Sequence, residues 1–206
     1  MFKRQYLIVI AIITVVLFID QVLKFWIKTN FTLGQEILPL GVDWCRLHFV
    51  ENDGMAFGLK LGDSGTWGKL ALTIFRLVAV TFLGLFMRSL LRKDEDFVFV
   101  CSLALVWAGA MGNIVDSLIY GQIFSESGVH SPALFLPSAG GYAPFMHGKV
   151  VDMFYFPVWS GMVPDWIPYY GGQYNEFFRP VFNFADASIS VGVALIIVGQ
   201  LFGGRK

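Results

Sequence analysis

Four long apolar segments constrain the fold of this chain more than any other feature. They cover about residues 6–27, 68–91, 97–120 and 182–203, and each has the roughly 20 residues that a helix needs to cross a bilayer. Only 15% of the 206 residues are charged, whereas soluble domains have about 25%. The sequence therefore predicts an all-α membrane protein with four transmembrane helices.

The first apolar segment lies near the N-terminus and has some features of a signal peptide. Its apolar run extends from Tyr6 to about Ile27, which is longer than the core of a signal peptide, and no small-x-small cleavage motif follows it. We therefore predict that this segment is retained as the first transmembrane helix.

Basic residues predict the orientation of the four segments. Lysines and arginines gather in short stretches at residues 3–4, 88–93 and 205–206, whereas the long loops at about 28–67 and 121–181 have few. Because positively charged loops stay on the cytoplasmic side, both termini are predicted to be cytoplasmic and both long loops to face outward.

The two long loops differ in their sequence patterns. The first loop contains WCRLHFVENDG, which predicts a small strand or hairpin before the Asn-Asp-Gly turn. The second, rich in glycine, proline and aromatic residues, is expected to pack on the membrane surface or over a cleft.

Several function classes lack their residues in this sequence. The formal net charge of zero argues against a nucleic-acid partner. Cys45 and Cys101 lie on opposite sides of the bilayer in the predicted topology, and the three histidines are scattered, so we expect no disulfide, no metal and no cofactor. GxSxG, HExxH and glycine-rich phosphate motifs are also missing, which disfavours serine and zinc hydrolases.

The polar residues of the four segments gather toward one side of the membrane. With a rise of about 1.5 Å per residue, they fall within roughly 12 Å of the predicted outer surface. A conduction path would need polar groups through the whole thickness, whereas a site at the outer interface needs only this layer. Intramembrane ionisable residues are costly and usually functional. The layer comprises Asp20, Lys24, Arg76, Asn113, Asp116, Asn183 and Asp186.

Asp152 and Asp186 are the candidate catalytic pair. Asp152 is a lone carboxylate in the apolar run GKVVDMFYFP, and Asp186 opens the last segment. Two carboxylates held close together share one proton, so the ionised one can deprotonate a water while the protonated one polarises an amide carbonyl. Asp116 is a rival member of the pair. Simpler interpretations stay open, with Asp152 as an ordinary loop carboxylate and Asp186 as a helix cap.

The remaining members of the layer have structural interpretations too. Asp20 and Lys24 are four residues apart on one helical face and are expected to form a structural ion pair. Arg76 either extends to the interface or points inward, toward Asp116 or a substrate carbonyl. Tryptophan and tyrosine side chains are expected to anchor the protein at the membrane interface.

Five short blocks carry a resemblance to a known family. In order along the chain, they resemble the signature blocks of lipoprotein signal peptidase (signal peptidase II), a family of bacterial inner-membrane aspartyl peptidases. These enzymes remove the signal peptide from prolipoproteins and cut before a diacylglyceryl-modified cysteine. The blocks are DQVLK (20–24), ENDGMAFG (51–58), GAMGNIVD (109–116), GKVVDMF (148–154) and FNFADASIS (182–190).

The resemblance implies roles for the matched residues. Asp152 and Asp186 would be the catalytic dyad, in a single peptidase domain with a small outer β-cradle at about residues 33–62. A mobile element over the cleft, membrane lipid as a partner and a monomeric state are also expected. Arg76, which the five blocks do not include, joins the predicted supporting set. The supporting and substrate-binding positions are Asp20, Lys24, Asn52, Gly54, Arg76, Asn113, Asp116 and Asn183.

Three features depart from the family pattern. Ser117 stands where the family usually has arginine, and Asp53 where it usually has a small residue or threonine. The connection from about residue 121 to 147 is also much longer than usual. It is expected to cap the site or to contact a partner.

Two other functions compete with the peptidase. An ion-coupled membrane transporter component would use the intramembrane carboxylates as relays, and it predicts polar positions continuing to the cytoplasmic side. A noncatalytic assembly or chaperone subunit would account for the aromatic loops but not for the carboxylate layer.

Overall fold

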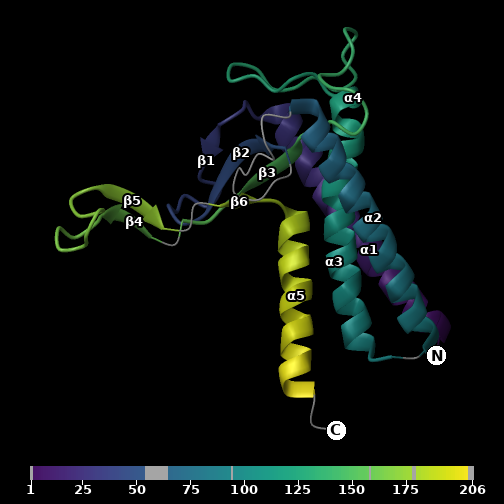
Figure 1. Ribbon diagram of the computed structural model, residues 1–206. Helices are drawn as coiled ribbons and strands as arrows, with labels where there is room; N and C mark the ends of the chain where they lie inside the picture. The colour runs from purple at the N-terminus through teal and green to yellow at the C-terminus, as the bar shows by residue number, and fades with distance from the viewer. Residues whose placement is uncertain (1, 54–64, 94, 158, 178–179, 204–206) are drawn as a thin grey trace.

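Four long helices form the body of the molecule (Figure 1). The computed structural model describes residues 2–53, 65–93, 95–157, 159–177 and 180–203. All four helices are long and apolar enough to cross a membrane, which confirms the predicted fold class. Their bounds are Phe2–Asn30 for α1, Gly65–Lys93 for α2, Phe97–Val115 for α3 and Phe184–Gly203 for α5.

Helix α3 continues beyond Val115 without a break in the chain direction. A π-helical turn, η2 (Asp116–Tyr120), and a short helix, α4 (Gly121–Ile123), extend it. Helix α5 begins two residues later than the predicted segment, because Val181 and Phe182 pair with a neighbouring strand.

Small residues allow α1, α3 and α5 to pack closely. A Cβ atom on Gly109 of α3 would lie 2.3 Å from the carbonyl oxygen of Ala185 in α5, and one on Gly112 would lie 2.6 Å from Oδ2 of Asp20 in α1. The hydroxyl of Ser188 also donates a 2.9 Å hydrogen bond to the carbonyl of Leu105. Close backbone approach through glycine is typical of helix pairs in membranes, and it brings the polar ends of three helices together.

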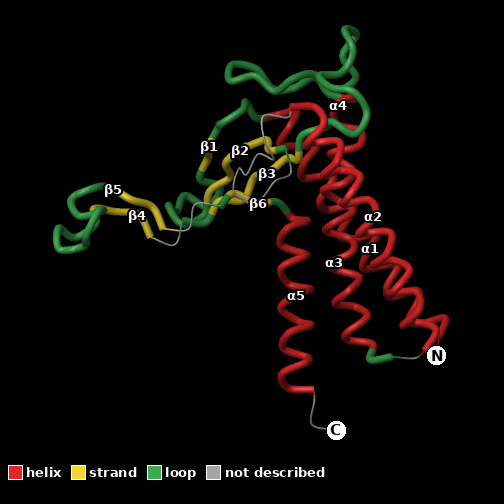
Figure 2. The backbone as a smooth tube through the Cα atoms, in the orientation of Figure 1, coloured by secondary structure: helices red, strands yellow, loops and turns green. Residues whose placement is uncertain are grey.

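A four-stranded antiparallel sheet lies at one end of the helices (Figure 2). The prediction placed a strand or hairpin in the first loop, where β1 pairs with β2, and the second loop supplies β3 and β6. The central pair, β2 and β3, aligns Val50 with Asp152 and Asn52 with Val150. In the order β1-β2-β3-β6, the strands are Glu36–Ile37, Arg46–Asn52, Val150–Tyr155 and Val181–Phe182.

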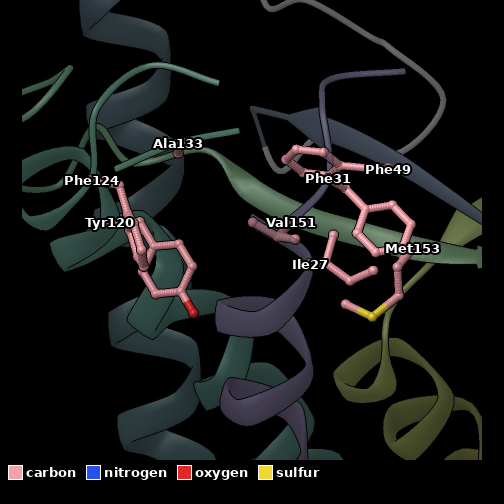
Figure 3. Close-up of a cluster of buried hydrophobic side chains, with 8 residues drawn as sticks. All are labelled: Ile27, Phe31, Phe49, Tyr120, Phe124, Ala133, Val151 and Met153. Carbon is pink, nitrogen blue, oxygen red and sulfur yellow. The ribbon is translucent and has the colours of Figure 1, made fainter. Parts of the chain in front are cut away.

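A hydrophobic cluster joins this sheet to the helix ends (Figure 3). Val151 and Met153 of β3 belong to it, and Asp152 between them does not. Because successive side chains of a strand point to opposite faces, the cluster holds one face of β3 and leaves Asp152 on the other. Its members are Ile27, Phe31, Phe49, Tyr120, Phe124, Ala133, Val151 and Met153.

The long connection at 121–147 is an ordered segment that follows the end of α3. The backbone N–H of Ala143 donates to the carbonyl of Gly121 at 2.9 Å, and that of Gly148 donates to Ser117 at 2.9 Å. A Cβ on Gly148 would lie only 2.1 Å from the carbonyl oxygen of Asp116, so glycine is required there for the segment to return to the sheet. The returning chain then enters β3 and carries Asp152.

Candidate active site

Asn183 links the two candidate catalytic carboxylates. Its fully buried side chain donates from Nδ2 to Oδ1 of Asp152 at 2.7 Å. Its backbone N–H donates to Oδ2 of Asp186 at 3.3 Å, and its Oδ1 accepts from the backbone N–H of Asp186 at 2.9 Å. Asp152 comes from β3 and Asp186 from the first turn of α5, so one asparagine holds two distant parts of the chain around the same site.

The contacts between Asn183 and Asp186 also cap helix α5. Asn183 directly precedes the helix and Asp186 is its third residue, and their two reciprocal hydrogen bonds form a capping box. The simpler interpretation of Asp186 as a helix cap is therefore compatible with its place in the site. Each of the two side chains is bound to the other residue's backbone N–H, so the Asp186 carboxylate is held in one orientation.

Two more asparagines donate hydrogen bonds to the carboxylates. Asn113 of α3 donates from Nδ2 to Oδ1 of Asp186 at 2.7 Å. Asn52, at the end of β2, donates from Nδ2 to Oδ2 of Asp152. Each carboxylate thus accepts two hydrogen bonds from surrounding N–H groups. These hydrogen bonds hold both carboxylates in fixed orientations.

Asp152 is buried, with only 4% of its surface exposed. Burial, together with the nearby negative charge of Asp186, raises the pKa of the Asp152 carboxyl to about 7. This carboxyl is therefore mostly protonated below about pH 7. A protonated carboxyl beside an ionised one is the arrangement needed to polarise a carbonyl while activating a water.

Lys24 forms the centre of a second buried layer beneath the two carboxylates. Its Nζ lies 3.0 Å from Oδ2 of Asp20 and 2.8 Å from Oδ2 of Asp116, and all three side chains are completely buried. It also donates to Oδ1 of Asn113 at 2.9 Å. The predicted pair of Asp20 and Lys24 is thus present, with Asp116 as a third member.

Asp20 and Asp116 reach the site through backbone groups. Oδ1 of Asp20 accepts from the N–H of Ala185, next to Asp186, at 2.9 Å. Oδ2 of Asp116 accepts from the N–H of Val151, next to Asp152, at 3.3 Å. Asp116 is therefore bound by a lysine and a backbone amide, and this position favours a structural role over membership of the dyad.

Helix α2 contributes a basic residue to the surroundings of the dyad. The guanidinium of Arg76 interacts electrostatically with Asp186 and Asp152. Three residues earlier, Thr73 donates to the carbonyl of Met146 at 3.2 Å, which ties α2 to the inserted segment. Gly54, the remaining predicted position, lies outside the described residues.

A third buried cluster, centred on Lys28, was not predicted from the sequence. Its Nζ is bound to Oε1 of Glu51 and lies 2.9 Å from the hydroxyl of Ser127. The hydroxyl of Ser127 in turn donates to Glu51 at 2.8 Å. Lys28 is four residues after Lys24 on the same helical face, a spacing that pointed to a shared environment. Its partner from the inserted segment had no signal in the sequence.

Two departures from the family pattern have clear local surroundings. Ser117 is buried in the π-helical turn, where its hydroxyl donates to the carbonyl of Asn113 at 3.1 Å. Asp53 lies 3.3 Å from Nζ of Lys69.

The cysteines and possible metal ligands form no site of their own in the part of the chain that the structure describes. Both cysteines are free. Among the described residues, no group of three or more histidine, cysteine or acidic side chains could hold a metal ion.

A hydrophobic cluster lies toward the opposite end of the helical bundle. Buried side chains of α1, α2 and α3 form it, and none of the described buried ion pairs lies there. Its members are Val9, Met87, Leu90, Leu91, Val100, Leu103 and Ala104. This arrangement favours a site at one membrane surface over a path across the bilayer.

Fold and site together define a multi-pass membrane protein with a buried carboxylate site at one end of its helices. The family model of signal peptidase (SPase) II matches residues 12–202. The chain therefore belongs to the signal peptidase II family, a class of membrane proteases.

Curated relatives agree with this assignment, and a solved structure agrees with the fold. The lipoprotein signal peptidase of Porphyromonas gingivalis is 48% identical over 192 residues, which are 93% of this chain and 81% of the relative. That of Amoebophilus asiaticus is 37% identical over 93% of this chain and 75% of its own. A bacterial membrane enzyme of known structure superposes with a TM-score of 0.59 at 22% identity, covering 94% of this chain and 92% of that one. The last match supports the fold alone.

Proposed function

We propose that this protein is an aspartyl endopeptidase that removes signal peptides from prolipoproteins. The observation that carries the proposal is the pair Asp152 and Asp186, held around Asn183. The relatives named lipoprotein signal peptidase supply the substrate class. Cleavage before a diacylglyceryl-modified cysteine is part of the proposal.

The proposed reaction is direct attack by water on the scissile carbonyl carbon. Asp186, ionised, takes a proton from the water, while Asp152, whose raised pKa of about 7 favours the protonated form below that pH, transfers its proton to the carbonyl oxygen. The new C–O bond gives a tetrahedral diol. Its collapse breaks the C–N bond as the proton taken up by Asp186 passes to the leaving nitrogen, and Asp152 regains its original proton.

The position of the site suits a lipid-modified substrate. The dyad lies where β3 meets the first turn of α5, at the end of helices long enough to span the bilayer. A diacylglyceryl group could stay among lipid chains while the peptide crosses the polar layer. We place this end of the molecule at the extracytoplasmic face of a bacterial inner membrane, with both termini cytoplasmic and the chain acting as a monomer.

Cleavage of a diacylglyceryl-modified prolipoprotein peptide by the purified protein in detergent tests the proposal. Asp152→Asn and Asp186→Asn should each lose at least about two to three orders of magnitude in kcat. Asp43→Asn, at an exposed loop position, is the control and should keep full activity. Asp116→Asn tests the rival carboxylate and should retain more activity than either dyad variant.

Two results would overturn the dyad assignment. One is near-normal cleavage by a folded Asp152→Asn or Asp186→Asn variant. The other is a loss in Asp116→Asn as large as theirs while its circular dichroism and thermal unfolding stay normal. Cleavage of an unmodified peptide at the same rate as the lipid-modified one would refute the substrate class and leave the dyad intact.

A further inference from the structure

The strands β4 (Trp159–Met162) and β5 (Tyr174–Phe177) form an antiparallel hairpin of their own. They make a two-stranded sheet that is separate from the four-stranded one. The hairpin connects β3, which carries Asp152, to β6, which precedes Asn183. It therefore lies between the two halves of the candidate site in the chain, although it is remote from the dyad in space.

The tip of the hairpin is closed by its own backbone. Val163 donates to the carbonyl of Gln173 at 2.9 Å and Gly172 donates back to Val163 at 2.9 Å, while Gly171 donates to Ile167 at 2.9 Å. The tip is thus a defined structure. A two-stranded hairpin of this kind is marginally stable at best in water unless a further surface covers it.

The exposed side chains of the hairpin are unusually large and aromatic. Trp166 is 81% exposed and Tyr169 is 95% exposed. These side chains combine an apolar ring with a polar N–H or O–H group, which suits the boundary between lipid headgroups and acyl chains. The other large exposed side chains are Trp159, Met162, Tyr170 and Tyr174.

The hairpin extends sideways from the molecule at about the level where α5 begins (Figure 1). It does not cover the helical bundle, and the space beneath it is occupied by the bilayer if the four helices span a membrane. The segment at 124–148 lies farther from the spans, beyond the four-stranded sheet (Figure 1). If the helices span a membrane, the hairpin therefore lies beside the bundle at the level of one membrane surface.

We infer that the hairpin at residues 159–177 binds the surface of the lipid bilayer at headgroup level. Headgroup level is the depth that side chains with an apolar ring and a polar N–H or O–H group prefer in a bilayer. The segment contains Asp165 and Glu176 but no lysine or arginine. Binding therefore depends on the aromatic side chains and does not require anionic lipid. Attachment there fixes the height of Asp152 and Asn183 relative to the membrane.

Spin labels on the full-length protein in phosphatidylcholine vesicles test this inference. Cys45 and Cys101 are first replaced by serine, and single cysteines are then introduced as Trp166→Cys, Tyr169→Cys and, as a control on the inserted segment, Ser138→Cys. Labels at 166 and 169 should show a severalfold higher ratio of collision with oxygen to collision with a water-soluble nickel complex than the label at 138. Adding phosphatidylglycerol should leave the ratios unchanged.

Three outcomes would overturn the inference. Labels at 166 or 169 as accessible to nickel as the one at 138 would show that the hairpin projects into water. Labels shielded from both reagents would show that protein covers it, as in a dimer joined through its edges. Lipid contact that appears only with phosphatidylglycerol would show that binding depends on anionic lipid and not on the aromatic side chains. Because the measurement needs no cleavage, its failure is distinct from failure of the proposed peptidase function.

Discussion

Lys24 and Lys28 lie one helical turn apart on α1 and are both completely buried, yet their surroundings differ. Lys24 contacts two aspartates, Asp20 and Asp116, that belong to transmembrane helices. Lys28 contacts Glu51 at the end of β2 and a serine from the inserted segment. The first cluster joins three helices beneath the dyad, and the second attaches loops to the end of one helix.

The two clusters are connected to the carboxylates of the candidate site differently, one from the helical bundle and one from the loops. The cluster of Lys24 reaches Asp186 through Asn113, and it reaches Asp152 through the backbone of Val151. Among the described residues, the cluster of Lys28 is linked to Asp152, because Glu51 directly precedes Asn52, which donates to Asp152. Breaking the two clusters should therefore affect stability and catalysis to different extents.

The largest effect is expected for Lys24→Met. The substitution leaves Asp20 and Asp116 buried without a compensating charge, and removing one partner of a buried ion pair costs about 3–5 kcal/mol. The free energy of unfolding, measured in mixed micelles by circular dichroism, should fall by about that amount. Lys24→Met combined with Asp116→Asn should recover part of the loss. A single variant as stable as the wild type would show that the aspartates are neutral or solvated.

A smaller loss is expected for Lys28→Met. Glu51 keeps the hydroxyl of Ser127 at 2.8 Å and has Nζ of Lys149 at 3.9 Å, so its charge retains partial compensation. We expect a loss of about 1–3 kcal/mol in the free energy of unfolding. The kcat should also fall, with little change in KM, because Asn52 would be less well held against Asp152.

The comparison of Lys28→Met with Lys28→Arg checks this explanation. Arginine can keep the charge and a hydrogen bond to Glu51, so it should restore part of the kcat. A loss in Lys28→Met equal to that in Lys24→Met would contradict the difference between the clusters.

The pH dependence of cleavage separates the clusters in another way. Because the pKa of Asp152 is raised to about 7, kcat should decline as the pH rises through that value and the carboxyl loses its proton. Asp116 contributes to raising this pKa. In Asp116→Asn the decline should therefore move to lower pH, whereas in Lys28→Met it should stay in place. An unchanged profile in Asp116→Asn would refute electrostatic coupling of the Lys24 cluster to the dyad.

The same raised pKa affects stability with a definite sign. Between about pH 4 and 7 the folded chain keeps the proton of Asp152 while the unfolded chain releases it, because the ordinary pKa is 3.8. Folded protein then binds more protons than unfolded protein, so stability falls with rising pH in this range and levels off above it. Asp152→Asn should remove this part of the pH dependence.

The sequence predicted the Lys24 cluster better than the Lys28 cluster for a physical reason. Asp20 and Lys24 are separated by one helical turn, so helical periodicity predicted their ion pair. The family resemblance singled out Asp116, but its contact with Lys24 was not predicted. The contact between Lys28 and Ser127 instead depends on how the inserted segment folds. No periodicity describes that segment, and its path is set by close contacts such as that of Gly148 with Asp116.

The fold was also predicted where the sequence has a local pattern, and not where it depends on contacts between distant segments. Apolar length predicted the four transmembrane helices, because spanning the bilayer requires about 20 apolar residues each. The sheet was predicted only as a strand or hairpin in the first loop, whereas β3 and β6 come from the second loop. Pairing between strands about 100 residues apart leaves no local pattern. Asn183 was predicted as a supporting or substrate-binding residue, but its contact with Asp152 depends on that pairing.

The smallest effect is expected for Ser127→Ala in the Lys28 cluster. The hydroxyl donates to Glu51 and accepts from Lys28, but the ion pair between them remains when it is removed. The free energy of unfolding should fall by about 1 kcal/mol, as for one buried hydrogen bond, and kcat should change less than in Lys28→Met. Ser138→Ala, at an exposed position of the same segment, should be neutral. If Ser127→Ala instead lowered kcat as far as Lys28→Met, the serine would hold Glu51 in place more than the lysine does. The inserted segment would then control Asn52 directly.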